Sequence, residues 1–191
     1  MNMKYIVLFW LFPFAFPLWA QTPVEKFTLI NVVDNAPVSL DGCAGCKGVA
    51  VIFTSTVCPY DQYYLGRIKD LINTYEGKIQ FLLVNSCPEP EESAENMKNF
   101  QTSRGLTVPY LADKDQVAMN ALGARRSPEV FLLQNVNNKQ VVIYNGALDD
   151  NPQVANAVTR NYLKSAIDKL LAGQEIETPV SRAAGCSIRK K

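Results

Sequence analysis

The sequence contains no histidine among its 191 residues. Ser-His-Asp triads, Cys-His dyads, histidine zinc sites and ordinary histidine-ligated haem all need an imidazole, so this absence excludes them. An excess of charge of one sign is also missing, because 19 basic residues balance 18 acidic ones. The sequence therefore gives no indication of a nucleic-acid partner or of binding to an acidic membrane surface.

Residues 1–20, MNMKYIVLFWLFPFAFPLWA, join one lysine to an apolar run that Pro13 and Pro17 interrupt. This pattern is typical of a cleaved signal peptide, and a membrane-spanning helix is the weaker interpretation because the run is short and contains two prolines. We therefore expect a signal peptide over 1–20, no membrane anchor in the mature chain, and a periplasmic or secreted protein. Disulfides persist in those compartments.

Apolar periodicity along the rest of the chain predicts one α/β domain. Strands are predicted at 26–33, 48–55, 78–86, 129–134 and 139–146, helices at 59–76, 89–104 and 152–171, and a short strand and helix within 108–123. With the usual right-handed crossover, this order gives a mixed central sheet flanked by helices over 21–175. Residues 176–191 show no period and are expected to form an extended, partly mobile tail.

Five cysteines follow the expected signal peptide: Cys43, Cys46, Cys58, Cys87 and Cys186. An odd number leaves at least one thiol without a partner in its own chain. Cys58 stands directly after an apolar strand and directly before Pro59, which suits the first turn of a helix. We expect Cys58 at a helix N-terminus, where backbone N–H groups and the helix dipole lower a cysteine pKa and supply a nucleophile.

Cys87 occupies the matching position after the next strand. If the two strands are parallel neighbours, Cys87 lies at the same sheet edge as Cys58 and could resolve its oxidised form. A solitary loop cysteine is the alternative interpretation.

Cys43 and Cys46 form a C-x-x-C within DGCAGCKG, a spacing shared by redox dithiols, zinc half-sites and haem attachment motifs. The pair precedes a strand instead of a helix, no second C-x-x-C completes a zinc site, and Lys47 stands where a haem motif has histidine. A loop disulfide, structural or accessory to Cys58, is the favoured interpretation. We expect neither a metal nor another cofactor.

Several segments carry a family resemblance: FTSTVCPYDQYYLGRI, VPYLADKDQVA, GARRSPEVFLL, YNGALDDNPQ and GCSIRKK. In them the sequence resembles thioredoxin-fold redoxins of the alkyl hydroperoxide reductase and thiol-specific antioxidant class, bacterial proteins with a CPY active-site segment. The resemblance implies a thioredoxin-like fold, Cys58 as the active-site cysteine, and Pro128 as a cis-proline that faces it across the site. It also implies that Ser127 offers its backbone to an extended substrate segment.

The sequence departs from this family at the site itself. Relatives often have cysteine three residues before the CPY cysteine, where this chain has Ser55, and some have cysteine where it has Arg126. Ser55 is similar to the hydroxyl of the peroxiredoxin T-x-x-C motif, which helps orient a peroxide, although Val51 stands where that motif has proline. Arg126 is kept as a candidate substrate-binding residue, and Arg125 is interpreted as a solvated charge.

The leading hypothesis is an exported thiol redox enzyme with antioxidant, peroxide-reducing activity or with thiol–disulfide exchange activity. Cys58 attacks the substrate, and Cys87, the Cys43–Cys46 pair or Cys186 resolves the product. The expected partner is a thiol reductant or a disulfide-bearing protein. A non-catalytic thioredoxin-fold binding module with structural disulfides is the alternative.

Overall fold

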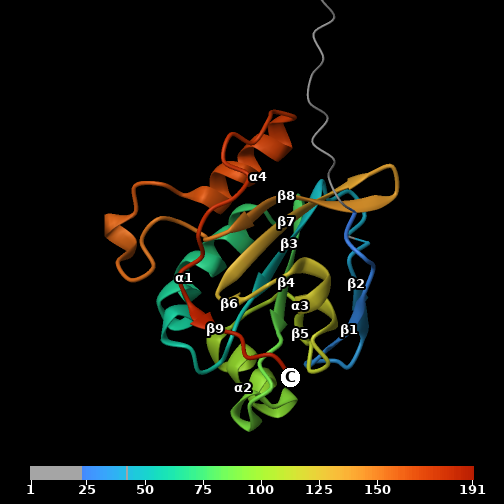
Figure 1. Cartoon of the computed structure of the whole chain (residues 1–191), viewed down its shortest axis with the longest axis vertical. Coiled ribbons are helices and arrows are strands. Elements are labelled where there is room, and N and C mark those ends of the chain that lie inside the picture. Colours follow the sequence, from blue (N-terminus) through green and yellow to red (C-terminus); the bar gives the residue numbers. More distant parts are fainter. Residues whose placement is uncertain (1–22, 42) are drawn as a thin grey trace, which may run out of the picture.

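The computed structural model describes residues 23–41 and 43–191, and the expected signal peptide over 1–20 lies outside these ranges. A mixed sheet runs through the molecule in the order β2-β1-β5-β4-β3-β7-β8 (Figure 1). Its strands are β1 (Thr28–Asn31), β2 (Pro37–Ser39), β3 (Gly48–Phe53), β4 (Ile79–Asn85), β5 (Tyr110–Ala112), β7 (Glu129–Val136) and β8 (Lys139–Gly146). The predicted mixed central sheet is therefore confirmed.

Strand β3 lies in the interior of this sheet, between β4 and β7, and all of its residues are buried. It pairs in parallel with β4 and antiparallel with β7. The parallel pairing places the carboxyl ends of β3 and β4 at one edge of the sheet, as the sequence predicts. Any residue that follows either strand starts from this edge.

Helices cover both faces of the sheet. Helices α1 (Pro59–Thr74), α2 (Ala94–Arg104) and α4 (Tyr162–Ala172) pack on the face that carries Ala50 and Ile52 of β3. The short helix α3 (Val117–Leu122) packs on the opposite face, with Val51 and Phe53. None of the helices in the described ranges has the length and apolarity needed to cross a bilayer.

The predicted helix over 89–104 begins later than expected. Residues Pro90–Glu92 form the 3-10 helix η1, and Ser93 then caps α2 by accepting the Asn96 N–H at 3.3 Å. The capping hydroxyl satisfies a backbone donor of the first turn and thereby sets the start of α2 at Ala94. As a result Glu92 points into the protein, where it is fully buried.

The predicted helix over 152–171 is also shorter, since α4 begins at Tyr162. Residues 152–161 instead form a loop with the 3-10 turn η2 (Ala155–Ala157). The Asn151 Oδ1 accepts the backbone N–H groups of Gln153 and Val154 at 3.2 and 2.8 Å, and this side-chain turn competes with helix formation. Val154, expected on the apolar face of the helix, is 54% exposed.

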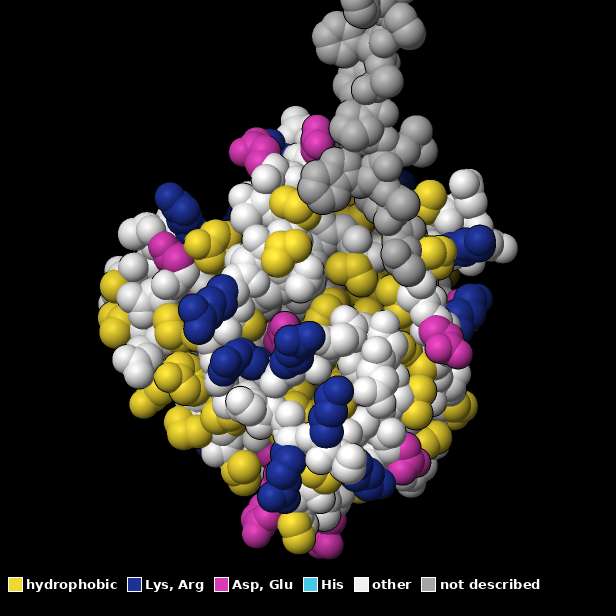
Figure 2. All heavy atoms as spheres, in the orientation of Figure 1, with side chains coloured by type: hydrophobic (Ala, Val, Ile, Leu, Met, Phe, Trp, Pro, Cys, Tyr) yellow, Lys and Arg dark blue, Asp and Glu magenta, His cyan; other side chains and the backbone are white. Residues whose placement is uncertain are grey.

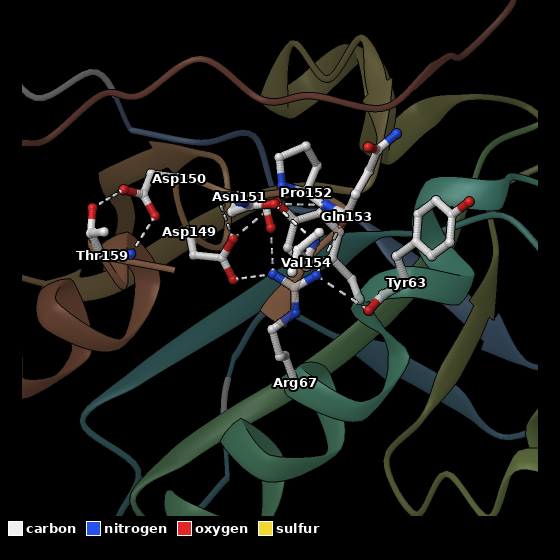
Figure 3. A network of polar contacts seen from close by, with 10 residues as sticks. Tyr63, Arg67, Asp149, Asp150, Asn151, Pro152, Gln153, Val154 and Thr159 are labelled. Carbon is white, nitrogen blue, oxygen red and sulfur yellow. Dashed lines mark hydrogen bonds and ion pairs between the residues drawn. The ribbon is translucent and has the colours of Figure 1, made fainter. Parts of the chain in front are cut away.

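Arg67 of α1 holds the start of this loop (Figure 3). Its guanidinium donates to the Asp149 carboxylate at 2.5 Å and to the carbonyl oxygens of Asn151 and Pro152 at 2.8 and 3.1 Å. Asp149 is 4% exposed, so the ion pair is largely removed from water. The contact fixes the YNGALDDNPQ segment against the helix that follows Cys58.

The C-terminal tail lies along the body of the protein (Figure 1). It forms the short strand β9 (Cys186–Ser187), which pairs antiparallel with β6 (Arg126–Ser127). Ala183 and Ile188 are buried, and Ile188 belongs to the core cluster on the α3 face. The tail is extended, as predicted, but it is packed against the domain at both ends of β9.

Candidate active site

Cys58 lies at the carboxyl edge of the sheet, as the sequence predicts. It is the N-cap residue of α1, with Pro59 in the first helical turn, and its backbone is extended. The Cys58 side chain is only 3% exposed. The free N–H groups and the positive end of the helix dipole at this position favour a sulfur that carries negative charge.

Cys58 forms a disulfide with Cys186 of the tail, and the two Cα atoms are 6.1 Å apart. The two residues are 128 positions apart in the sequence. The β6–β9 pairing brings them together, because Ser127 is the register partner of Cys186 and its carbonyl oxygen lies 3.3 Å from the Cys58 Sγ. The structure thus joins the helix N-terminus and the tail at one covalent bond.

The Ser127–Pro128 peptide bond is cis, as the family resemblance implies. Both residues are buried, and Ser127 faces Cys58 with its backbone. The segment that pairs with this backbone is the chain's own tail. The Arg126 guanidinium donates to the Gly185 carbonyl at 2.9 Å, so this predicted substrate-binding side chain also holds the tail.

Ser55 holds the turn that carries Cys58. Its Oγ accepts the N–H groups of Val57 and Cys58 at 3.2 and 3.1 Å and donates its own proton to the Glu92 carboxylate. This differs from the expected role of orienting a peroxide, because the only proton of the hydroxyl is already directed at Glu92. Ser55 therefore acts on Cys58 through the backbone.

Glu92 is the centre of a buried polar network that the sequence does not reveal. Besides Ser55, it accepts hydrogen bonds from the Thr56 backbone and hydroxyl and from the Asn85 amide. Burial favours the neutral acid, but these donors outweigh burial and hold the pKa of Glu92 below its usual value. The sequence does not distinguish Glu92, because it lies in the acidic run PEPEESAE, in which the other glutamates are exposed or partly exposed.

Asp61 is a second buried carboxyl group, one helical turn after Cys58. It accepts the Ser127 hydroxyl at 2.6 Å and is 3% exposed. Burial raises the pKa of Asp61 well above its usual value, although the hydrogen bond from Ser127 acts in the opposite direction. Asp61 therefore ties the first turn of α1 to the cis-proline loop. The sequence carries no local signal for it, because an aspartate in a first helical turn is usually solvated.

Cys87 does not form a disulfide with Cys58 in the structure. Among the described residues it is the free cysteine, and it is 8% exposed. Burial, reinforced by the Glu92 and Glu89 carboxylates, raises the pKa of Cys87 to about 12. The expected position at the same sheet edge is found, but the turn after β4 buries the thiol, and the Cys87 N–H is bonded to Asn85 at 3.1 Å.

Cys43 and Cys46 form the predicted loop disulfide. They precede β3, whereas Cys58 follows it, so the two disulfides lie at opposite ends of this strand. A direct exchange between the two disulfides is therefore not supported by this arrangement. The pair is also more open to solvent, since Cys43 is exposed.

Gln116 is a further site residue that the sequence did not reveal. It is 3% exposed and adopts a left-handed backbone conformation with φ of 56°. Its side chain donates to the Arg189 carbonyl at 2.7 Å and accepts the Lys191 N–H at 2.9 Å. Gln116 thereby holds the last residues of the tail, a contact that sequence spacing cannot indicate.

The comparisons with known proteins identify the family and the fold of the chain. The profile described as Redoxin matches residues 20–162. An uncharacterized conserved protein from Geobacillus kaustophilus and a hypothetical protein from Sinorhizobium meliloti 1021 each superpose with a TM-score of 0.78 at 26% identity. Both alignments span 90% of this chain, and they span 92% and 94% of the other chains, respectively.

The peroxidoxin BcpB from Mycobacterium tuberculosis has the same fold, with a TM-score of 0.56 at 15% identity over 80% of this chain and 96% of its own. No protein with a curated description matches the sequence. The likenesses establish the thioredoxin-like fold that the sequence predicts.

Proposed function

Because the chain belongs to the Redoxin family, we propose that it is a thiol–disulfide oxidoreductase in which Cys58 attacks the substrate and Cys186 resolves the intermediate. The observation that carries this proposal is the disulfide between the helix N-cap and the tail strand, beside a cis-proline. A nucleophilic cysteine needs a position that stabilises its thiolate and a second sulfur within bonding reach. Cys58 and Cys186 meet both requirements.

The reaction proceeds by two exchanges. The Cys58 thiolate attacks one sulfur of the substrate disulfide, the substrate S–S bond breaks, and one half leaves as a thiolate. The Cys186 thiolate then attacks the Cys58 Sγ, forms the Cys58–Cys186 bond and releases the second half. Two electrons pass from the protein to the substrate, and an external dithiol returns them by reducing the internal disulfide.

Hydroperoxide reduction is the second candidate activity. In that reaction the Cys58 thiolate attacks a peroxide oxygen, the O–O bond breaks to give a sulfenic acid and an alcohol, and Cys186 displaces water. The polar groups favour disulfide exchange, because the Ser55 hydroxyl is bonded to Glu92 and the Arg126 guanidinium to Gly185. These groups are already engaged and do not offer a peroxide a dedicated donor.

We also propose that the protein acts after export, in the periplasm or outside the cell. The pattern of residues 1–20 and the two disulfides support this location. Fractionation of cells with an antibody against the mature chain tests it. Recovery of the full-length, reduced chain from the cytoplasm would contradict export.

Single cysteine variants test the assigned roles. Cys58→Ser should abolish reduction of a model disulfide, whereas Cys186→Ser should stop after one exchange and accumulate a mixed disulfide on Cys58, detected by mass spectrometry. Cys43→Ser/Cys46→Ser is the matched control, since it removes the disulfide at the opposite end of β3. Full turnover by Cys58→Ser, or a mapped bond between Cys58 and Cys87, would refute the assignment and favour a non-catalytic module.

A further inference from the structure

The tail occupies the backbone edge beside the cis-proline, and it is held there by contacts that do not involve sulfur. Upstream of Cys186, the Ser181 Oγ accepts the Ala147 N–H at 2.9 Å and lies 2.7 Å from the Tyr144 hydroxyl. The Ser181 backbone also bonds to Asn145. Gly146 allows this close approach, because a Cβ there would lie 2.1 Å from the Ser181 carbonyl oxygen.

Next to the disulfide, the tail is fitted closely to the loop that carries Ser127. A Cβ on Gly185 would lie 2.3 Å from the Ser127 carbonyl oxygen, so only glycine fits directly before Cys186. The Ile188 N–H donates to the Arg125 carbonyl at 2.9 Å, and the Ile188 side chain is 8% exposed. The segment Arg125–Ser127 therefore contacts both the glycine before Cys186 and the isoleucine two residues after it.

Downstream of the disulfide, the chain end is clamped. Gln116 binds the backbone on both sides of Lys190, while Arg189 pairs with Glu89 at 3.2 Å and Lys191 with Asp115 at 3.1 Å. Figure 2 shows Lys and Arg side chains gathered over the face along which the tail runs. The buried Gln116 amide is the strongest of these contacts, because the ion pairs are exposed.

We infer that the tail stays docked when the Cys58–Cys186 bond is reduced, and that it restricts the proposed reaction to low-molecular-weight disulfides. This inference rests on the proposed function. An extended protein segment would have to pair with Ser127, where β9 already lies, and would have to displace the contacts on both sides of Cys186. A small disulfide needs only to reach the sulfur pair, and Cys186 is partly exposed to solvent.

Two measurements on the full mature protein test this inference. Amide hydrogen exchange should show Ile188 and Lys191 protected to a similar degree in the oxidised and dithiol-reduced forms. Pre-reduced protein should reduce oxidised glutathione at least tenfold faster than it reduces the disulfides of insulin. Loss of tail protection on reduction, or insulin reduced as fast as oxidised glutathione, would overturn the inference.

A variant of Gln116, which holds the end of the tail, gives the complementary result. Gln116→Ala should raise the ratio of insulin to glutathione-disulfide turnover at least tenfold, whereas Gln174→Ala, an exposed glutamine on the same tail connection, should leave the ratio unchanged. A chain ending at Ile188 removes the Gln116 contacts to Arg189 and Lys191, keeps the core residue Ile188 and should behave like Gln116→Ala. An unchanged ratio in both clamp variants would overturn the inference.

These outcomes distinguish failure of the substrate restriction from failure of the proposed function. If no disulfide of either size is turned over, the proposed function fails and the substrate restriction fails with it. If only insulin is turned over and Cys58→Ser abolishes that activity, the oxidoreductase assignment stands and the restriction is wrong.

Discussion

The Ser55 hydroxyl connects Cys58 to the buried Glu92, because it accepts the Cys58 N–H while it donates to the carboxylate. Glu92→Ala leaves the Ser55, Thr56 and Asn85 donors buried without an acceptor. We expect a loss of about 3 kcal/mol in the free energy of unfolding, since each unsatisfied buried group costs roughly 1–3 kcal/mol. Urea unfolding measures this loss of stability.

Glu91→Ala is the matched control, because Glu91 is exposed in the same 3-10 helix. Equal stability of the two variants would contradict the role of Glu92.

Asp61 should make stability depend on pH. Its pKa in the folded protein lies above the unfolded value of about 3.9, so the neutral carboxyl stabilises the fold at low pH. This stabilisation is lost as the pH rises from about 4 through the raised pKa, because the buried group must then ionise or the protein must unfold. Asp61→Asn keeps an acceptor for the Ser127 hydroxyl but cannot ionise.

The measurement for Asp61 is urea unfolding at several pH values between 4 and 9. The stability of Asp61→Asn should increase relative to wild type as the pH rises, while the exposed control Asp70→Asn should follow the wild-type curve. Parallel curves for wild type and Asp61→Asn would show that Asp61 is ionised without cost in the folded protein.

The sequence predicts those features that depend on local pattern. The buried strand before Cys58, Pro59 in the first turn and the parallel neighbouring strand follow from apolar runs and turn chemistry, and they place Cys58 correctly. The partner of Cys58 could not be predicted in this way, because Cys186 is brought to the site by a two-residue strand at the end of the tail. A contact of that kind has no period in the sequence.

Two further errors have the same physical origin. Apolar spacing predicts a helix over 152–171, but the Asn151 side chain accepts the backbone N–H groups of Gln153 and Val154, and α4 begins ten residues later. Glu92 and Gln116 are polar residues in polar stretches, and only the tertiary structure makes them buried. In each case a side-chain hydrogen bond determines the local structure, and apolar periodicity does not indicate that bond.

Arg67 should contribute strongly to stability. It pairs with the buried Asp149 and also holds the carbonyl oxygens of Asn151 and Pro152 (Figure 3). Arg67→Met leaves Asp149 as a buried charge without its partner, which should cost about 3 kcal/mol and lower Tm by roughly 10 °C. Calorimetry tests this. Arg160→Met, at an exposed position in the following loop, is the control and should lie within about 0.5 kcal/mol of wild type.

Cys87 should be nearly inert in the folded, reduced protein. With burial and the neighbouring carboxylates raising its pKa to about 12, the thiolate fraction at neutral pH is lower by a factor of roughly a thousand than that of an ordinary thiol with a pKa of about 8.5. Iodoacetamide at pH 7.5 should therefore label Cys58 and Cys186 and leave Cys87 unmodified until urea unfolds the protein. Cys87→Ala should reduce disulfides at the wild-type rate. Labelling of Cys87 at the rate of Cys186 in folded protein, or loss of activity in a folded Cys87→Ala variant, would return Cys87 to the catalytic cycle.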